Sequence, residues 1–294
     1  MEENTAIEIE NAKASIIRSA EGILENGIVP AVPIVGSFGS EISGDDGDNE
    51  LIGDDRINII VGNGGNDTIF GSSSTTAIDG GDGDDLINGN GGFFIGGGAG
   101  NDTIFSAGTS LGIIGGDGND VINGSDDGEL FFGDAGNDRL EGNGGDDRLS
   151  GGVGNDLIIG GSGNDIIAGV NIESVSSEPG EIDTLVGGAG SDLFWLGDAE
   201  DYLYDDGVQS GFPDFGTGDY ALITDFTSED VIQLNGSANQ YITVATGFIN
   251  PQIPGGTGIF RNEGGFLSSD LVGVVEGIDP SQLSLSDTTQ FTYV

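Results

Sequence analysis

The sequence predicts an all-β protein whose central part is a parallel coil of short strands. Three observations predict this class: a nine-residue unit recurs from Gly44 to Trp195, one position of the unit stays apolar, and the residues between are rich in Gly, Asn and Asp. A fixed apolar residue between two outward-facing neighbours indicates a three-residue strand. Glycine accepts positive φ, and Asn or Asp tolerates the left-handed region, so the intervening residues are expected to form turns.

The repeated unit has the template G-G-x-G-(N/D)-D-x-U-x, where U is a large apolar residue. Seventeen units fit, with one single-residue deletion in the unit 89–96, and position eight is apolar in sixteen of them. A position that stays apolar while its neighbours vary is expected to be buried, so this row is the predicted core. In chain order, position eight holds Leu51, Ile60, Ile69, Ile78, Ile87, Ile95, Ile104, Ile113, Ile122, Phe131, Leu140, Leu149, Ile158, Ile167, Ser176, Leu185 and Phe194.

Two units make one circuit of such a coil, so alternate units share an edge, and the two edges differ in chemistry. The sixth-position residues of the first edge are Asn49, Asp67, Asp85, Asp102, Asp120, Asp138, Asp156, Ser174 and Asp192. Those of the second edge are Asn58, Thr76, Phe93 or Phe94, Leu111, Glu129, Asp147, Asp165 and Asp183. Aspartate therefore occupies position six along most of the first edge, but only near the end of the second edge.

The pattern resembles the RTX nonapeptide repeat over residues 44–195. The resemblance implies a parallel β-roll that binds calcium between successive turns of one edge. Its ligands are the side chain of position six and turn carbonyls. The expected side-chain ligands are Asn49, Asp67, Asp85, Asp102, Asp120, Asp138, Asp147, Asp156, Asp165, Asp183 and Asp192. The expected carbonyl ligands belong to Gly62, Gly64, Gly80, Asp82, Gly97, Ala99, Gly115, Asp117, Gly133 and Ala135.

A calcium ion between circuits needs oxygens from both turns, because it takes about six to eight ligands. We therefore predict a row of sites on the first edge from Asp67 through Asp156. A shorter row is predicted on the second edge around Asp147, Asp165 and Asp183. The early second-edge turns, including 72–76 and 108–111, are predicted to be metal-free. Solvated acidic loops are the alternative, but solvation does not require aspartate at one fixed position.

The charge of the chain predicts that folding depends on calcium. There are 51 acidic and 6 basic residues, which gives a net charge of −45. Successive circuits lie about 4.8 Å apart, so carboxylates on one edge repel each other. The apolar row is one residue wide and cannot stabilise the coil alone. We expect the roll to be unfolded at cytosolic calcium and to fold cooperatively in extracellular calcium.

The segment 1–43 is predicted to hold a short helix that packs onto the coil. Apolar residues recur three or four positions apart between Asn11 and Glu25, which indicates an amphipathic helix. The start of the chain lacks the basic and apolar regions of a cleaved secretory signal. Export by another route is therefore expected.

The segment 196–294 is predicted to be a β-rich cap. Its residues read as short strands separated by Gly, Pro and Asn turns, for example 220–226 and 230–234. These stretches are similar to the cap that follows the repeats in RTX proteins. Such proteins leave the cell through a type I secretion channel, guided by an uncleaved C-terminal signal, and residues 287–294 resemble that signal.

Composition excludes several function classes. The chain has no Cys and no His, which excludes disulfides, thiolate or imidazole metal sites and a Ser-His-Asp triad. The strong negative charge argues against nucleic acid and anionic membranes as partners, and no apolar stretch reaches the roughly 20 residues that span a bilayer. The G-x-S-x-G match at 108–112 lies in a decayed repeat turn and is assigned to chance. The chain is therefore expected not to be an enzyme.

The leading hypothesis is a secreted, non-catalytic, calcium-binding structural protein of the cell surface or extracellular matrix. A second hypothesis is self-association into a filament or surface layer through the open ends of the coil. Ice binding by the second edge and a hydrolase within residues 196–294 are weaker alternatives.

Overall fold

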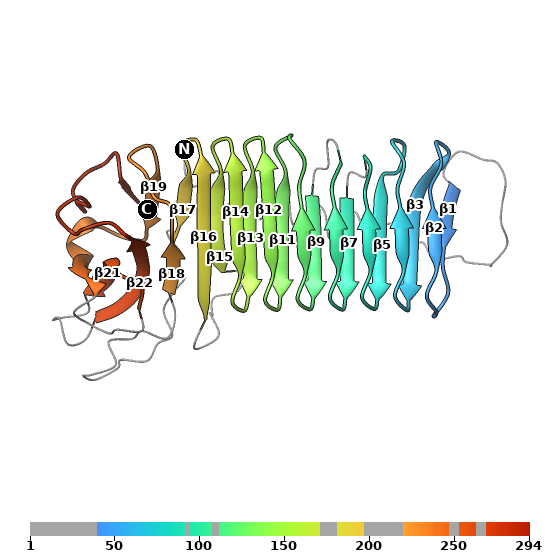
Figure 1. Cartoon of the computed structure of the whole chain (residues 1–294), viewed down its shortest axis with the longest axis horizontal. Helices are drawn as coiled ribbons and strands as arrows, with labels where there is room; N and C mark the ends of the chain where they lie inside the picture. Colours follow the sequence, from blue (N-terminus) through green and yellow to red (C-terminus); the bar gives the residue numbers. More distant parts are fainter. Residues whose placement is uncertain are drawn as a thin grey trace.

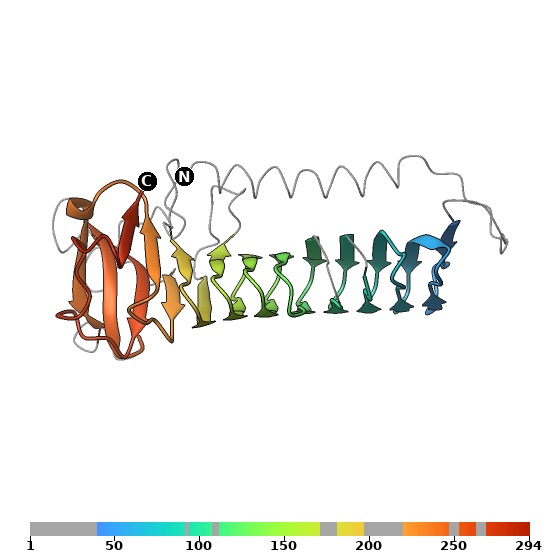
Figure 2. The same cartoon turned by 90° about the horizontal axis from the view of Figure 1, so that it is seen from above.

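A computed structural model of the chain describes residues 40–91, 94–107, 112–170, 181–196, 220–246, 253–262 and 269–294. It shows a long stack of short strands that leads into a smaller group of strands at the C-terminal end (Figure 1). Viewed from above, the stack is narrow and the C-terminal group is broader (Figure 2). Successive strands alternate between two sheets, so the predicted all-β parallel solenoid is confirmed.

Both sheets run the length of the stack. The first sheet has eleven strands, in the spatial order β1 (Ser40–Ser43), β3 (Ile57–Gly64), β5 (Ala77–Asp82), β7 (Phe94–Ala99), β9 (Gly112–Asp117), β11 (Leu130–Ala135), β13 (Arg148–Val153), β15 (Ile166–Val170), β17 (Leu193–Trp195), β19 (Val231–Leu234) and β23 (Phe291–Tyr293). The second sheet has twelve strands, in the order β2 (Glu50–Ile52), β4 (Thr68–Phe70), β6 (Leu86–Asn88), β8 (Thr103–Phe105), β10 (Val121–Asn123), β12 (Arg139–Gly144), β14 (Leu157–Ser162), β16 (Ile182–Ala189), β18 (Tyr220–Ile223), β22 (Ser269–Glu276), β21 (Gly256–Asn262) and β20 (Tyr241–Ala245). The chain also contains a short 3-10 turn, η1 (Ala238–Gln240).

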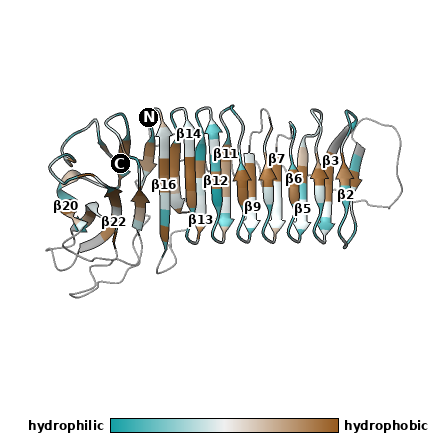
Figure 3. Ribbon diagram, in the orientation of Figure 1, coloured by the Kyte–Doolittle hydropathy of each residue, from teal (hydrophilic) through white to brown (hydrophobic). Residues whose placement is uncertain are grey.

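The core of the stack is the predicted apolar row. Every apolar position-eight residue is buried, with at most 8% of its surface exposed. Apolar residues follow the strands in Figure 3, and more hydrophilic residues lie at the turns. These side chains form one continuous cluster that extends into the C-terminal strands. Burial of one residue per strand thus holds the two sheets together.

Strand pairing fixes the period of the coil. Ile60 lies opposite Ile78, the position-eight residue two units later, as two units per circuit require. Ile78 lies opposite Ile95, which stands one position short of two full units, and this confirms the deletion in the unit 89–96.

Two successive steps of the stack, one in each sheet, are longer than predicted. Ile158 pairs with Leu185 and Ile167 pairs with Phe194, and both steps span three units instead of two. Each of these steps is one unit longer than the others, so the later units change edges without any change in the sequence period. The predicted assignment was therefore wrong for two residues: Asp183 lies on the first edge and Asp192 on the second. Ser174 and Ser176 lie outside the described residues.

The C-terminal strands continue the stack before they change direction. β18 pairs in parallel with β16, and β19 with β17. β20, β21 and β22 then pair in antiparallel fashion at the end of the second sheet. A second, smaller core lies here, formed by Tyr220, Ile253, Phe260, Leu271 and Val274. The helix predicted between Asn11 and Glu25 falls outside the described residues.

Candidate metal sites

Each regular first-edge turn places one carboxylate over a glycine, as the turn between β5 and β6 illustrates. The backbone N–H of Asp67 donates to Oδ1 of Asp85 at 2.7 Å, so the carboxylate bridges two circuits. The other oxygen, Oδ2, lies over Gly80, where a Cβ would approach it to 2.3 Å. This close approach explains why glycine occupies position one of the unit.

The same hydrogen bond recurs along the whole first edge. The N–H of one sixth-position residue donates to Oδ1 of the next, at 2.7 to 2.9 Å. We call this row the first-edge ladder; it consists of Asn49, Asp67, Asp85, Asp102, Asp120, Asp138, Asp156 and Asp183. One oxygen of each aspartate accepts this bond. In the aspartates from Asp67 to Asp156, the other oxygen lies over the position-one glycine of the same unit.

The directed oxygens are buried and lack hydrogen-bond partners. In the part of the chain that the structure describes, this state is shared by Oδ2 of Asp67, Asp85, Asp102, Asp120, Asp138, Asp147, Asp156, Asp165 and Asp192. All nine residues are at most 3% exposed. A buried carboxylate oxygen without a partner costs free energy. A row of nine indicates that the turns are built to be completed by cations.

Burial raises the pKa of these carboxyl groups. Desolvation is the main cause, and it raises the pKa of Asp102, Asp120 and Asp147 to about 7. The pKa of Asp156 rises further, to about 9, because the charge of Asp183 adds to the desolvation. Without a cation, these carboxyls therefore keep their protons to a higher pH in the folded turns than in an unfolded chain.

The carbonyl groups of these turns lie beside the same oxygens. A Cβ at Gly97 would lie 2.3 Å from Oδ2 of Asp102 and 2.6 Å from the carbonyl oxygen of Gly115. Carboxylate and carbonyl oxygens from two circuits are the ligands that calcium prefers. The sequence matches the family of RTX calcium-binding nonapeptide repeats over residues 43–74, 77–93, 94–108, 113–140, 132–167 and 180–204. This chain is an RTX repeat protein. No curated protein matches it.

The predicted carbonyl ligands of this RTX protein occupy two positions of the turn. Those of position one, Gly62, Gly80, Gly97, Gly115 and Gly133, each lie next to the position-six side chain of the same unit. The position-three residues Gly64, Asp82, Ala99, Asp117 and Ala135 lie at the same edge, and the carbonyls of Ala99, Asp117 and Ala135 accept hydrogen bonds of 2.6 to 2.7 Å from glycine N–H groups of the preceding circuit. A carbonyl oxygen has two lone pairs, so such a bond leaves one for a metal ion.

Asn49 differs from the aspartates that follow it. Its side-chain oxygen accepts a hydrogen bond of 2.7 Å from the N–H of Asp45, and its amide group donates to Oδ1 of the same residue. The first turn of the roll is thus held by an Asn–Asp pair.

The second edge carries a shorter RTX ladder in its C-terminal half. The N–H of Glu129 donates to Asp147, Asp147 to Asp165, and Asp165 to Asp192, at 2.8 to 2.9 Å. We call this row the second-edge ladder. Glu129 begins it, and its carboxylate accepts hydrogen bonds from the side chains of Ser106 and Ser125.

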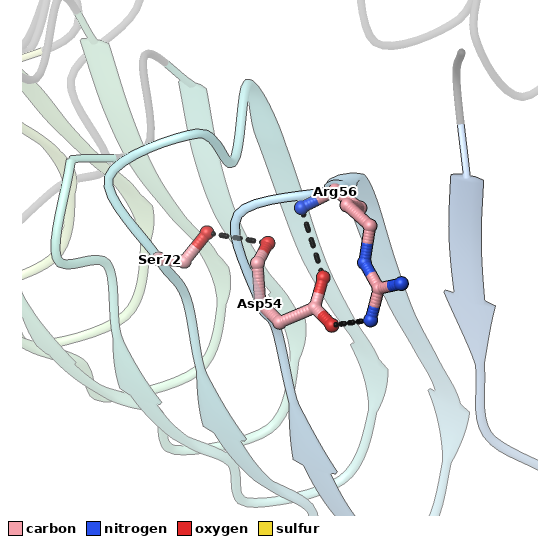
Figure 4. A network of polar contacts seen from close by, with 3 residues as sticks. All are labelled: Asp54, Arg56 and Ser72. Atoms are coloured by element: carbon pink, nitrogen blue, oxygen red, sulfur yellow. Dashed lines mark hydrogen bonds and ion pairs between the residues drawn. The ribbon is translucent and has the colours of Figure 1, made fainter. Parts of the chain in front are cut away.

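The early second-edge turns of the roll are closed by hydrogen bonds between side chains and backbone. Figure 4 shows Ser72 donating to the carbonyl of Asp54 at 2.9 Å, while the side chain and N–H of Arg56 both donate to the Asp54 carboxylate. The N–H of Ser72 donates to Oγ1 of the buried Thr75. These turns were predicted to be metal-free. Those among the described residues contain no buried carboxylate oxygen that lacks a hydrogen-bond partner. The turn 108–111 lies outside the described residues.

Three acidic residues of the RTX roll were missed because they do not stand at position six of an assigned unit. Asp230 continues the second-edge ladder, accepting a hydrogen bond of 3.0 Å from the N–H of Asp192. Asp225 accepts from the N–H groups of Gly187 and Gly188. Glu181 accepts a hydrogen bond of 3.1 Å from the N–H of Gly154. The signal for Asp230 was present, since D-V-I-Q at 230–233 repeats the last four positions of the unit.

Among the described residues there is no helix with the length and apolar character needed to cross a membrane.

Proposed function

We propose that this protein is an exported calcium-binding structural protein whose roll folds when it meets extracellular calcium. The observation that carries the proposal is the set of nine buried, unpartnered Oδ2 atoms aligned on two edges. The ligands proposed are these carboxylates with the turn carbonyls of the following circuit. Asp183 is proposed to act on the first edge and Asp192 on the second.

The link between calcium and folding follows from charge. The folded turns bring carboxylates of successive circuits close together in a chain that carries a net charge of −45. Each calcium ion supplies two positive charges and binds only where two turns are stacked, so it stabilises the folded state by mass action. Because calcium binds the folded roll and not the unfolded chain, the stability of the roll depends on the calcium concentration.

Circular dichroism and calcium titration of the full chain test the proposal. In chelator at neutral pH we expect the spectrum of an unfolded chain, and in millimolar calcium a β spectrum with several ions bound. Fluorescence of Trp195, which is 2% exposed in the folded roll, should shift to shorter wavelength in the same concentration range. A β spectrum that persists in chelator would contradict the proposal.

Magnesium at equal concentration is the control ion for this titration. It needs near-octahedral geometry and gives up water reluctantly, so the turn should not order around it. Equal folding in magnesium and calcium would show a general charge effect and would contradict specific calcium sites.

We also propose that export uses a type I secretion channel and the C-terminal segment. In the folded protein, Phe291 is buried in β23, which pairs in parallel with β19. The same segment is therefore available as a signal only before folding, which agrees with export of an unfolded chain. Export by cells that carry a type I channel should be lost on removal of residues 281–294. Export of the shortened chain would contradict this route.

Growth of the roll into a filament has less support from the geometry. The second sheet ends on the antiparallel strands β20 and β21, so a second roll cannot continue the parallel pairing at that end of this sheet. Particles larger than a monomer in calcium, seen by electron microscopy, would favour the filament.

A further inference from the structure

The circuit that spans three units carries an acidic cluster that the repeat does not account for. We propose that Asp156, Glu181 and Asp183 form a three-carboxylate cation site, which binds calcium more tightly than the other sites of the first edge. This inference rests on the proposed calcium-dependent fold and identifies the site that fills first.

The three carboxylates are close together and buried. One oxygen from each lies within 4.8 Å of the others. The residues are 3%, 2% and 0% exposed, respectively. Three acidic groups at such distances repel strongly in a low-dielectric environment, so a cation is the expected occupant.

Glu181 takes the place that a carbonyl group holds in the regular turns. In the preceding circuit, the N–H of Gly136 donates to the carbonyl of Val153 at 2.7 Å. The equivalent N–H, that of Gly154, donates instead to Oε1 of Glu181 at 3.1 Å. A charged oxygen thus replaces a neutral one at an equivalent point of the turn.

The residues after Glu181 return to the regular pattern. The N–H of Ile182 donates to the side-chain oxygen of Asn155 at 2.8 Å, which is the bond made by position five of other units. The N–H of Asp156 donates to Oδ1 of Asp183 at 2.9 Å, which is the bond of position six. Glu181 therefore stands at position four, where the regular units have glycine.

A further observation, the unpartnered oxygen of Asp156, indicates that this point binds a cation. Oδ2 of Asp156 is buried and has no hydrogen-bond partner. A Cβ at Gly151 would lie 2.1 Å from this oxygen and 2.4 Å from the carbonyl oxygen of Gly169. The site therefore offers an unpartnered carboxylate oxygen, a carbonyl from the next circuit and two further carboxylates.

The extra charge predicts the order of filling. A regular first-edge site lies between two sixth-position aspartates, whereas this site adds the carboxylate of Glu181. Calcium affinity rises with the number of charged ligands. The site should therefore be occupied at lower free calcium than its neighbours.

Equilibrium dialysis with radioactive calcium at buffered free concentrations tests this order in the full chain. Glu181→Gln should raise the free calcium needed for the first bound ion by about tenfold, because one charged ligand is lost. The control Glu50→Gln removes the same charge from an exposed position on β2 and should leave the first binding step unchanged. A first step that is equal in wild type and Glu181→Gln would overturn the inference and leave the calcium-dependent fold standing.

A second measurement needs no variant. Crystals of the wild-type protein with calcium and one equivalent of terbium(III) should show the strongest anomalous peak among the carboxylates of Asp156, Glu181 and Asp183, because a trivalent ion favours the most negative site. A strongest peak at any other turn would overturn the inference. Failure of the wild-type chain to bind calcium at all would instead contradict the proposed function.

Discussion

The first edge and the early second edge close the same coil with different chemistry. On the first edge, an aspartate bridges two circuits and leaves one oxygen buried without a partner, as in Asp102. On the early second edge, Ser72 and Thr75 close the turn through neutral hydrogen bonds. Both edges flank the same buried row, since Ile78 and Ile87 are each at most 3% exposed.

The difference shows that the coil itself does not require a carboxylate at every turn. The strands and the apolar row continue through turns of either kind. The aspartates add cation sites, because their Oδ2 atoms have no hydrogen-bond partner in the protein. The proposed dependence of folding on calcium therefore comes from the acidic turns and not from the turns closed by Ser72 and Thr75.

The largest difference between the two kinds of turn should appear when pH is varied without calcium. In the folded state, burial raises the pKa of Asp102, Asp120 and Asp147 to about 7, from an ordinary value of 3.8. A raised folded-state pKa favours folding below the unfolded value and loses that contribution as pH rises through the folded value. In chelator, β structure should therefore form near pH 4 and be lost as the pH approaches 7. A dichroism spectrum independent of pH would contradict burial of these groups.

The next largest effect is expected when a side chain is added at the glycine that lies against one ladder carboxylate. Gly97→Ala places a Cβ 2.3 Å from Oδ2 of Asp102 and 2.6 Å from the carbonyl of Gly115. We expect a loss of about 3 kcal/mol in the free energy of unfolding in calcium, measured by urea denaturation. The control is Gly96→Ala, where the nearest atom, on Asp79, is 3.9 Å from the added Cβ. Equal stability of the two variants would show that position one has no special role.

Neutralising one ladder residue should remove calcium without unfolding the roll at high calcium. Asp120→Asn keeps an oxygen acceptor but loses the charge, so at least one fewer calcium should bind per chain in equilibrium dialysis. Asp117→Asn is the matched control, because it keeps the backbone carbonyl predicted to be a ligand and changes only an exposed side chain three residues away in the same turn. If both variants bind the wild-type number of ions, Asp120 is not a ligand.

The smallest effect is expected on the early second edge. Thr75→Val removes the hydroxyl that accepts the N–H of Ser72 at 2.9 Å and leaves that N–H without this partner. Stability should fall by about 1 kcal/mol, while the calcium count stays the same. A lost ion in this variant would show that the neutral turn also binds metal, and would remove the distinction between the edges.

Much of the roll could be predicted because its period is local. The apolar residue at position eight predicted the core. The single-residue deletion predicted the shorter step from Ile78 to Ile95. The repeated aspartate at position six indicated the first-edge ladder. Each of these features depends on residues within one unit, so no long-range contact had to be known.

The edge assignment of the last units could not be derived from the period. The pairing steps from Ile158 to Leu185 and from Ile167 to Phe194 are longer than the others by one whole unit, so the nine-residue frame continues while the alternation between edges reverses. Only the chemistry of one unit differed, with serine at 174 and 176 where the pattern has aspartate and an apolar residue. Glu181 and Asp230 were missed for a related reason, because they join the ladders from places where the template assigns no ligand.

The central claim is that the orphaned carboxylates of the two ladders are calcium ligands. A crystal structure in calcium, with anomalous data that locate the ions, tests it most directly. We predict ions beside Oδ2 of the nine aspartates from Asp67 to Asp192 and none in the turns 53–58 and 71–76. Acidic ladder turns without ions, or ions bound in the turns 53–58 and 71–76, would contradict it.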